Sequence, residues 1–158
     1  MTQLLFKNIF VVLHVITAAG WFGLGLNLTR QARTVAALDP SSARPFIEDR
    51  LSSVRLMGIM IVLTFIFGLG AMFSGGGFGA YGAQYHTSML LILLLIAIHY
   101  ALIYPAWRGL ERAFSTTSRV LSDSDGYRKR IAMGMGLGHL IWLVVLILMF
   151  WNQIRIAL

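Results

Sequence analysis

The sequence predicts an all-α integral membrane protein, a four-helix bundle with both termini on the extracytoplasmic side. Of its 158 residues, 58% are hydrophobic and only 12% are charged, and the mean hydropathy is +0.76. Such a composition is typical of membrane proteins. Four apolar stretches have the length of about 20 residues that a helix needs to cross a bilayer, and the charged residues gather in two of the connections between them.

The expected spans follow one another along a single membrane domain that covers the whole chain. They comprise about residues 4–28, 55–74, 86–107 and 131–151. Polar connections at 29–54 and 108–130 join the first span to the second and the third to the fourth. A glycine-rich connection without charge joins the second to the third, where we expect a flexible turn at the membrane surface. We expect the first stretch to be a retained helix, because a secretory signal has basic residues before its apolar run rather than after it.

The distribution of basic residues predicts the orientation. Only Lys7 and Arg155 lie at one face, whereas the others lie in or beside the two polar connections: Arg30, Arg33, Arg44, Arg50, Arg55, Arg108, Arg112, Arg119, Arg128, Lys129 and Arg130. Because cytoplasmic loops carry the excess of Lys and Arg, both polar connections are expected in the cytoplasm. We therefore expect a multi-pass protein of a bacterial cytoplasmic (inner) membrane.

Composition also excludes several function classes. The chain has no cysteine, which excludes disulfides, thiolate metal sites and covalent haem attachment through CxxCH. All six acidic residues lie in the polar connections, so no carboxylate in the membrane can act as a general base. The net charge of +7 is explained by the topology-determining arginines, and we expect no nucleic-acid partner.

Four histidines, His14, His86, His99 and His139, lie in or at the edges of the spans. A titratable group in hydrocarbon is costly and marks a functional site by default. Each histidine could be satisfied by an interhelical hydrogen bond instead, but a bound cofactor accounts for all four together. The natural candidate is haem b, one or two per chain, with these histidines as ligands of the iron.

Depth in the membrane suggests a pairing. His99 lies nine residues before Arg108 and His139 nine residues after Arg130, which places both about 13 Å from the cytoplasmic face. Opposing haem ligands need similar depth, so these two form the expected pair. His14 lies about 20 Å from the same face if its helix ends at Asn27, and nearer to the outer surface and His86 if the helix is longer.

Other residues near the histidines suit a flat ring. Gly138 directly precedes His139 and permits close approach of a helix or a porphyrin. Trp21 lies seven residues after His14, on the same helix face, where it can line a cofactor pocket. His86 and His99 are 13 residues apart, about 140° around the helix, and so face different neighbours.

Two stretches resemble the HemJ-type protoporphyrinogen oxidases and the related CopD-type membrane proteins. They are His14–x6–Trp21 followed by Phe-Gly-Leu, and the run HTSMLLILLLIAIH from His86 to His99. The resemblance implies a helical membrane bundle that binds haem b, with His14 as an axial ligand. The family's lysine falls at Ser88, His139 has no counterpart, and the family's Asn-Glu-Pro signature is absent.

The expected function is therefore electron transfer by a b-type haem membrane protein, linked to quinone or serving as an accessory subunit of a respiratory or photosynthetic complex. The alternatives are a divergent protoporphyrinogen oxidase, for which the missing lysine is unfavourable, and copper transport with Met72, Met89 and His86 as soft ligands. A purely structural subunit and chlorophyll as the pigment are also open. Other membrane subunits or further copies of the chain are expected partners.

Overall fold

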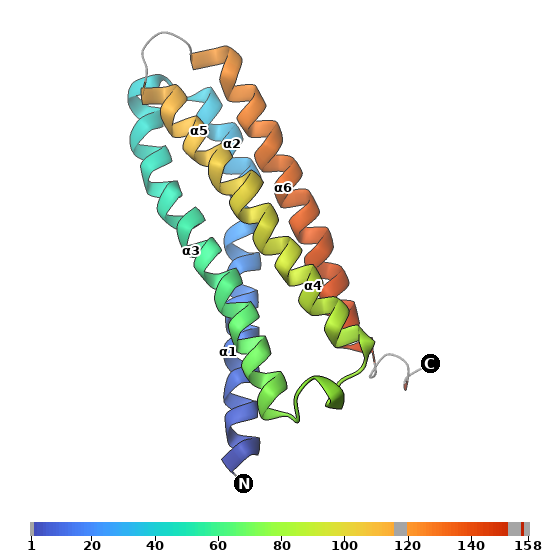
Figure 1. The fold of residues 1–158 in the computed structure, drawn as a ribbon. Coiled ribbons are helices and arrows are strands. Elements are labelled where there is room, and N and C mark those ends of the chain that lie inside the picture. Colours follow the sequence, from blue (N-terminus) through green and yellow to red (C-terminus); the bar gives the residue numbers. More distant parts are fainter. Residues whose placement is uncertain (1, 116–119, 152–155, 157–158) are drawn as a thin grey trace.

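The computed structural model describes residues 2–115, 120–151 and 156, and within them every long element is a helix (Figure 1). The elements are α1 (Thr2–Leu26), α2 (Leu28–Ala37), α3 (Pro40–Ser74), the 3-10 turn η1 (Phe78–Ala80), α4 (Ala83–Ile98), the π-helical segment η2 (His99–Ile103), α5 (Tyr104–Ser115) and α6 (Val120–Met149). Four helical stretches, Thr2–Val35, Ser41–Ser74, Ala83–Phe114 and Ser124–Met149, are long and apolar enough to cross a membrane. The expected all-α four-helix membrane bundle is confirmed.

The helices extend well beyond the expected spans. The connection at 29–54 is helical over most of its length, because α2 and the first turns of α3 occupy it. The physical reason is a stripe of apolar residues at helical spacing. Charged residues lie between them in the sequence, but on the helix the apolar residues share one face and the charged residues lie on the other. The stripe is buried and consists of Leu28, Ala32 and Val35 on α2 and Ala43, Ile47, Leu51 and Val54 on α3. An equivalent stripe on α5 includes Trp107, Leu110 and Phe114.

A capped turn separates α2 from α3. The Asp39 carboxylate accepts hydrogen bonds from the backbone N–H groups of Ser41 and Ser42, both at 3.1 Å, and Pro40 occupies the first helical position. This is the usual chemistry of a helix N-terminus. The side-chain hydrogen bonds from Ser41 and Ser42 lower the pKa of the exposed Asp39 carboxyl to about 2.

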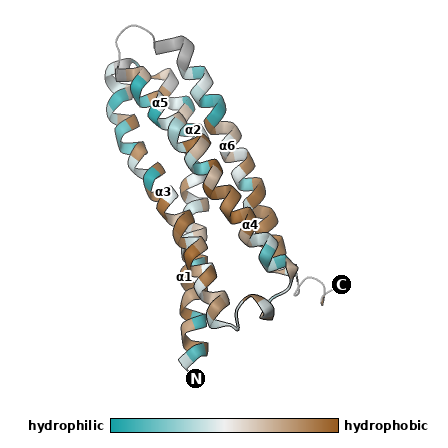
Figure 2. Ribbon diagram, in the orientation of Figure 1, coloured by the Kyte–Doolittle hydropathy of each residue, from teal (hydrophilic) through white to brown (hydrophobic). Residues whose placement is uncertain are grey.

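The bundle has two unlike ends (Figures 1 and 2). At the basic end, formed by α2, α5 and the first turns of α3 and α6, the buried stripes pack into one core. At the glycine-rich end, which contains the start of α1 and the connection at residues 75–82, α1 runs along α3 and α4 runs along α6, with far fewer contacts between the two pairs. Many large apolar side chains of α1, α4 and α6 are exposed there, as expected for a lipid-facing surface.

The third span changes its winding at His99. Over His99–Ile103 the helix is a π-helix, and the Tyr104 N–H bonds to the His99 carbonyl. Pro105 follows directly. Proline has no N–H and its ring crowds the carbonyl four residues earlier, so the wider turn removes a clash. π-bulges are frequent at functional sites, and this one fixes the direction of His99.

Candidate functional site

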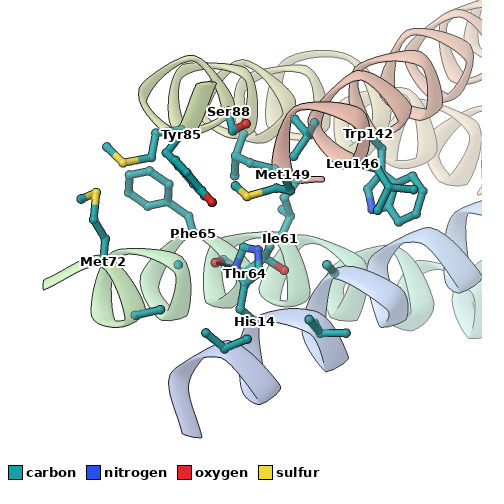
Figure 3. Close-up of a pocket in the computed structure, with 18 of the residues that line it drawn as sticks. His14, Ile61, Thr64, Phe65, Met72, Tyr85, Ser88, Trp142, Leu146 and Met149 are labelled. Atoms are coloured by element: carbon teal, nitrogen blue, oxygen red, sulfur yellow. Dashed lines mark hydrogen bonds between the residues drawn. The ribbon is translucent and has the colours of Figure 1, made fainter. Parts of the chain in front are cut away.

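A cavity of about 630 Å³ lies between the two helix pairs toward the glycine-rich end (Figure 3). Its volume is within the range of small-molecule and cofactor sites. All four spanning helices contribute to it, and its walls are mostly aliphatic and aromatic, including Ile61, Phe65, Ile92, Leu95, Trp142 and Leu146. The cavity lies where the α1–α3 and α4–α6 pairs make few contacts with each other.

His14 of α1 lines this cavity. Its Nδ1 lies 2.7 Å from the backbone carbonyl oxygen of Thr64 on α3, so a neutral ring donates the Nδ1 proton to that oxygen. The Nε2 atom then carries the lone pair, and within the described part of the chain it makes no hydrogen bond. Figure 3 shows the ring rising from α1 beside Thr64.

The α1–α3 contact around His14 depends on a glycine and two threonines. A Cβ at Gly68 would come within 3.0 Å of His14 Nδ1, so the absence of a side chain there leaves room for the ring. The hydroxyls of Thr17 and Thr64 lie 3.0 Å apart across the interface. This link between the two helices is the kind of interhelical hydrogen bond that membrane proteins use in place of hydrophobic association.

Trp21 is the second predicted residue in the cavity lining. Its side chain is buried, and its Nε1 has no hydrogen-bond partner among the described residues. Gly138 lies behind it, where a Cβ would be 3.1 Å from the Trp21 ring. The glycine at 138 therefore allows α6 to approach Trp21.

His99 and His139 lie outside the cavity lining. The fully buried His99 packs against α3, where a Cβ at Gly58 would come within 2.7 Å of its Nε2. The backbone of Val54 on α3 is the polar neighbour of the ring, but neither ring nitrogen makes a well-aligned hydrogen bond in the described residues. His139 packs against α1 instead, with its ring 5.2 Å from the Phe22 ring and its Nε2 close to Gly25. Because the two rings contact different helices, the structure does not bring them together as an opposing pair.

His86 lies at the glycine-rich end, also outside the cavity lining. Its ring stacks on Phe78 at 5.8 Å between centroids, with an interplanar angle of 13°. The structure thus separates His86 from His14, which bonds to Thr64. His14, His99 and His139 each pack against a glycine of a neighbouring helix, namely Gly68, Gly58 and Gly25.

Two cavity residues, Lys7 and Met149, were not predicted as site residues from the sequence, and Met72 and Met89 were named only for the copper alternative. The thioethers of Met72, Met89 and Met149 line the cavity together with His14, and Lys7 is the one charged lining residue among the residues that the structure describes. Within the described residues no cluster of three or more His, Cys, Asp or Glu side chains could hold a metal ion. The nitrogen and sulfur atoms that suit a transition metal in the lining are one imidazole nitrogen and three thioether sulfurs. Helical spacing could have placed Lys7 on the same face of α1 as His14. The methionines come from different helices, so no spacing within one span indicates that Met72, Met89 and Met149 meet.

The chain matches no protein-family model, and it has no significant match among curated proteins or solved structures.

Proposed function

We propose that this chain is a b-type haem-binding integral membrane protein of electron transfer, with one haem in the cavity and His14 as its axial ligand. The proposal rests on the hydrogen bond of the His14 ring, which determines which ring nitrogen carries the proton. Its Nδ1 proton is donated to the Thr64 carbonyl at 2.7 Å, which leaves Nε2 as the metal-binding nitrogen. Histidines that bind metals commonly donate their other ring N–H to a carbonyl or carboxylate, which fixes the ring and its tautomer.

The rest of the cavity fits the same group. Its walls are apolar on all four helices, and its volume of about 630 Å³ suits a cofactor. An imidazole and a thioether form a known axial pair for haem iron, and Met149 comes from α6, in the opposite helix pair to His14. A bound haem would supply one-electron chemistry. The protein's own contribution is to hold the imidazole, to exclude water and to set the potential through burial and the ligand pair.

The setting favours electron transfer within the membrane. The basic end carries the arginines of α2, α3, α5 and α6, which by the positive-inside rule is the cytoplasmic side. The cavity is then in the outer half of a bacterial cytoplasmic membrane. Quinone or a neighbouring membrane subunit is the expected redox partner, because the chain has little mass outside the bundle and exposes apolar faces on α1, α4 and α6.

A reduced-minus-oxidised optical spectrum of the purified protein tests this function. We expect a Soret band and an α band from about one haem per chain. The proposal would be contradicted if folded protein, expressed with a sufficient supply of haem, lacked both bands.

Protoporphyrinogen oxidation is a second candidate, because the resemblance aligns the family's lysine with a cavity residue. Ser88 lines the cavity, is fully buried and donates its hydroxyl to the Gln84 carbonyl at 2.8 Å. The matching position is therefore in the site but without a charge. We expect that the chain fails to complement a strain lacking the oxidase, and growth of that strain would favour the enzyme over the electron carrier.

Soft-metal binding is a third candidate, supported by three thioethers in one cavity. Met72 and Met89 line it as the copper hypothesis requires, but His14 takes the place of His86. Thioethers select Cu(I), although methionine is also a common core filler. Stoichiometric retention of Cu(I) by protein that contains no haem would favour this candidate.

A further inference from the structure

Lys7 is the starting point of a more specific inference about the ligand. It lies on α1, lines the same cavity as His14 and precedes it by seven residues. Seven residues are close to two helical turns, so both side chains leave the same face of α1 about 10 Å apart along its axis. This separation is comparable with that between the centre of a porphyrin and the carboxylates at its rim.

The charge of Lys7 has no counter-ion among the described residues. The acidic side chains that the structure describes lie at the basic end, in the segments Asp39–Asp49, Glu111 and Asp125. The aromatic ring of Tyr81 is the only partner found for Lys7 in the described residues, with Nζ 6.0 Å from the ring centroid. An ammonium group at the edge of an apolar cavity is therefore available to bind an anion.

Two tyrosines accompany Lys7 at this edge. Tyr81 and Tyr85 both line the cavity, and Figure 3 shows the Tyr85 hydroxyl directed into it. Phenolic O–H groups donate hydrogen bonds to carboxylates. The cavity thus has an imidazole nitrogen at depth, apolar walls, and a cation with the Tyr85 hydroxyl toward the glycine-rich end, whereas the Tyr81 hydroxyl packs against Gly75.

We propose that the cavity selects a ligand with an apolar ring and a carboxylate, and that Lys7 binds the carboxylate. On the proposed haem function, on which this inference rests, Lys7 would hold the propionates of the porphyrin at the glycine-rich end of the bundle. Lys7 is then the residue that determines orientation and selectivity for the free acid over an ester. A fatty acid shares the carboxylate but not the ring, and the experiment separates the two.

The test uses the detergent-solubilised full-length protein and protoporphyrin IX, which lacks iron and is therefore independent of iron ligation. Binding of the free acid and of its dimethyl ester is measured by fluorescence anisotropy. We expect Lys7→Gln to weaken binding of the acid by about 3- to 10-fold, as for a partly exposed ion pair near a low-dielectric surface, and to leave binding of the ester unchanged. Lys7→Arg is expected to retain acid binding.

The chain offers a matched control, since Lys129 is its one other lysine. Lys129→Gln removes the same charge at the basic end and is expected to change neither affinity. Equal affinity of wild type and Lys7→Gln for the acid would overturn the inference, as would an equal loss for acid and ester.

Two further experiments identify the ligand of the cavity and distinguish failure of this inference from failure of the haem function. Oleate is expected to displace protoporphyrin only at a large excess, and displacement at equal concentration would overturn the porphyrin as the ligand. His14→Ala is expected to abolish the haem bands but to keep the dependence of acid binding on Lys7. A wild-type protein without haem bands that retains this dependence would overturn the haem function and leave the inference standing.

Discussion

The Nδ1 atom of His14 lies 2.7 Å from the Thr64 carbonyl oxygen across the α1–α3 interface. Thr64 also places its hydroxyl 2.8 Å from the Met60 carbonyl, within its own helix. The threonine is thus tied to α3 while its backbone oxygen holds the histidine of α1. The ring is oriented before any ligand binds, which is how supporting residues prepare a metal ligand.

Gly68 is expected to be essential for that orientation. A Cβ at this position would lie 3.0 Å from His14 Nδ1, so Gly68→Ala should displace the ring and lengthen its bond to Thr64. We expect a several-fold loss of haem per chain, measured by a pyridine haemochrome assay. Gly136→Ala is the control, because a Cβ there meets nothing within 4 Å. Equal haem content in the two variants would contradict the role of Gly68.

Met149 is the residue that would hold the haem iron together with His14 on the proposed function. It reaches the cavity from α6, across from the α1–α3 pair. Replacing a thioether ligand lowers the reduction potential of a haem, so Met149→Leu should lower the midpoint potential measured by redox titration and shift the Soret band. Met89→Leu removes another cavity thioether and is expected to change neither. A normal potential and spectrum in Met149→Leu would exclude this pairing.

His99 is expected to tolerate an apolar substitution. Both ring nitrogens are buried and neither makes a well-aligned hydrogen bond, the backbone of Val54 being the polar neighbour of the ring. A poorly satisfied buried polar group costs about 1–3 kcal/mol. His99→Leu has a similar volume and should keep or raise stability by roughly 1 kcal/mol, as measured by thermal unfolding in detergent. Haem content should stay unchanged. Loss of haem in this variant would restore His99 as a ligand.

The start of α3 is expected to be sensitive to acid. The pKa of Asp39 is lowered from its ordinary value of 3.8 to about 2 by the hydrogen bonds from Ser41 and Ser42. A carboxyl with a lowered pKa in the folded state contributes stability that is complete above about pH 4 and is lost as the pH falls through about 2. The protection factors of the Ser41 and Ser42 amides, referred to the intrinsic exchange rate at each pH, should fall over that range. Asp39→Ala should show low protection factors at every pH.

The sequence was sufficient for the membrane class and the four spans, because hydropathy and span length are local properties. It also contained the buried stripe from Ala43 to Val54, but the arginines between those residues concealed it. Counting residues from the basic ends of the spans placed His99 and His139 at the same depth in the membrane. Depth alone, however, does not specify which neighbouring helix a side chain faces. That direction also depends on the rotation of the helix about its axis, which follows from tertiary packing, and at His99 on the π-helical turn that precedes Pro105.

The cavity itself could not be derived from the sequence. The buried stripes pack into one core at the basic end, and farther along the bundle residues from four helices meet around the cavity that His14 lines. His14 and Trp21 could be placed on one face by their spacing. Their partners on α3, α4 and α6 depend on which helices are neighbours, and no periodicity within one span contains that information.

The most direct test of the central claim compares the reduced-minus-oxidised spectrum of wild type with that of His14→Ala, both normalised to folded protein. His86→Ala serves as control, because His86 stacks on Phe78 outside the cavity lining. We predict Soret and α bands in wild type and in His86→Ala, and at least a tenfold loss of both bands in His14→Ala, the range expected when a metal ligand or its support is lost. Full bands in His14→Ala would contradict the account.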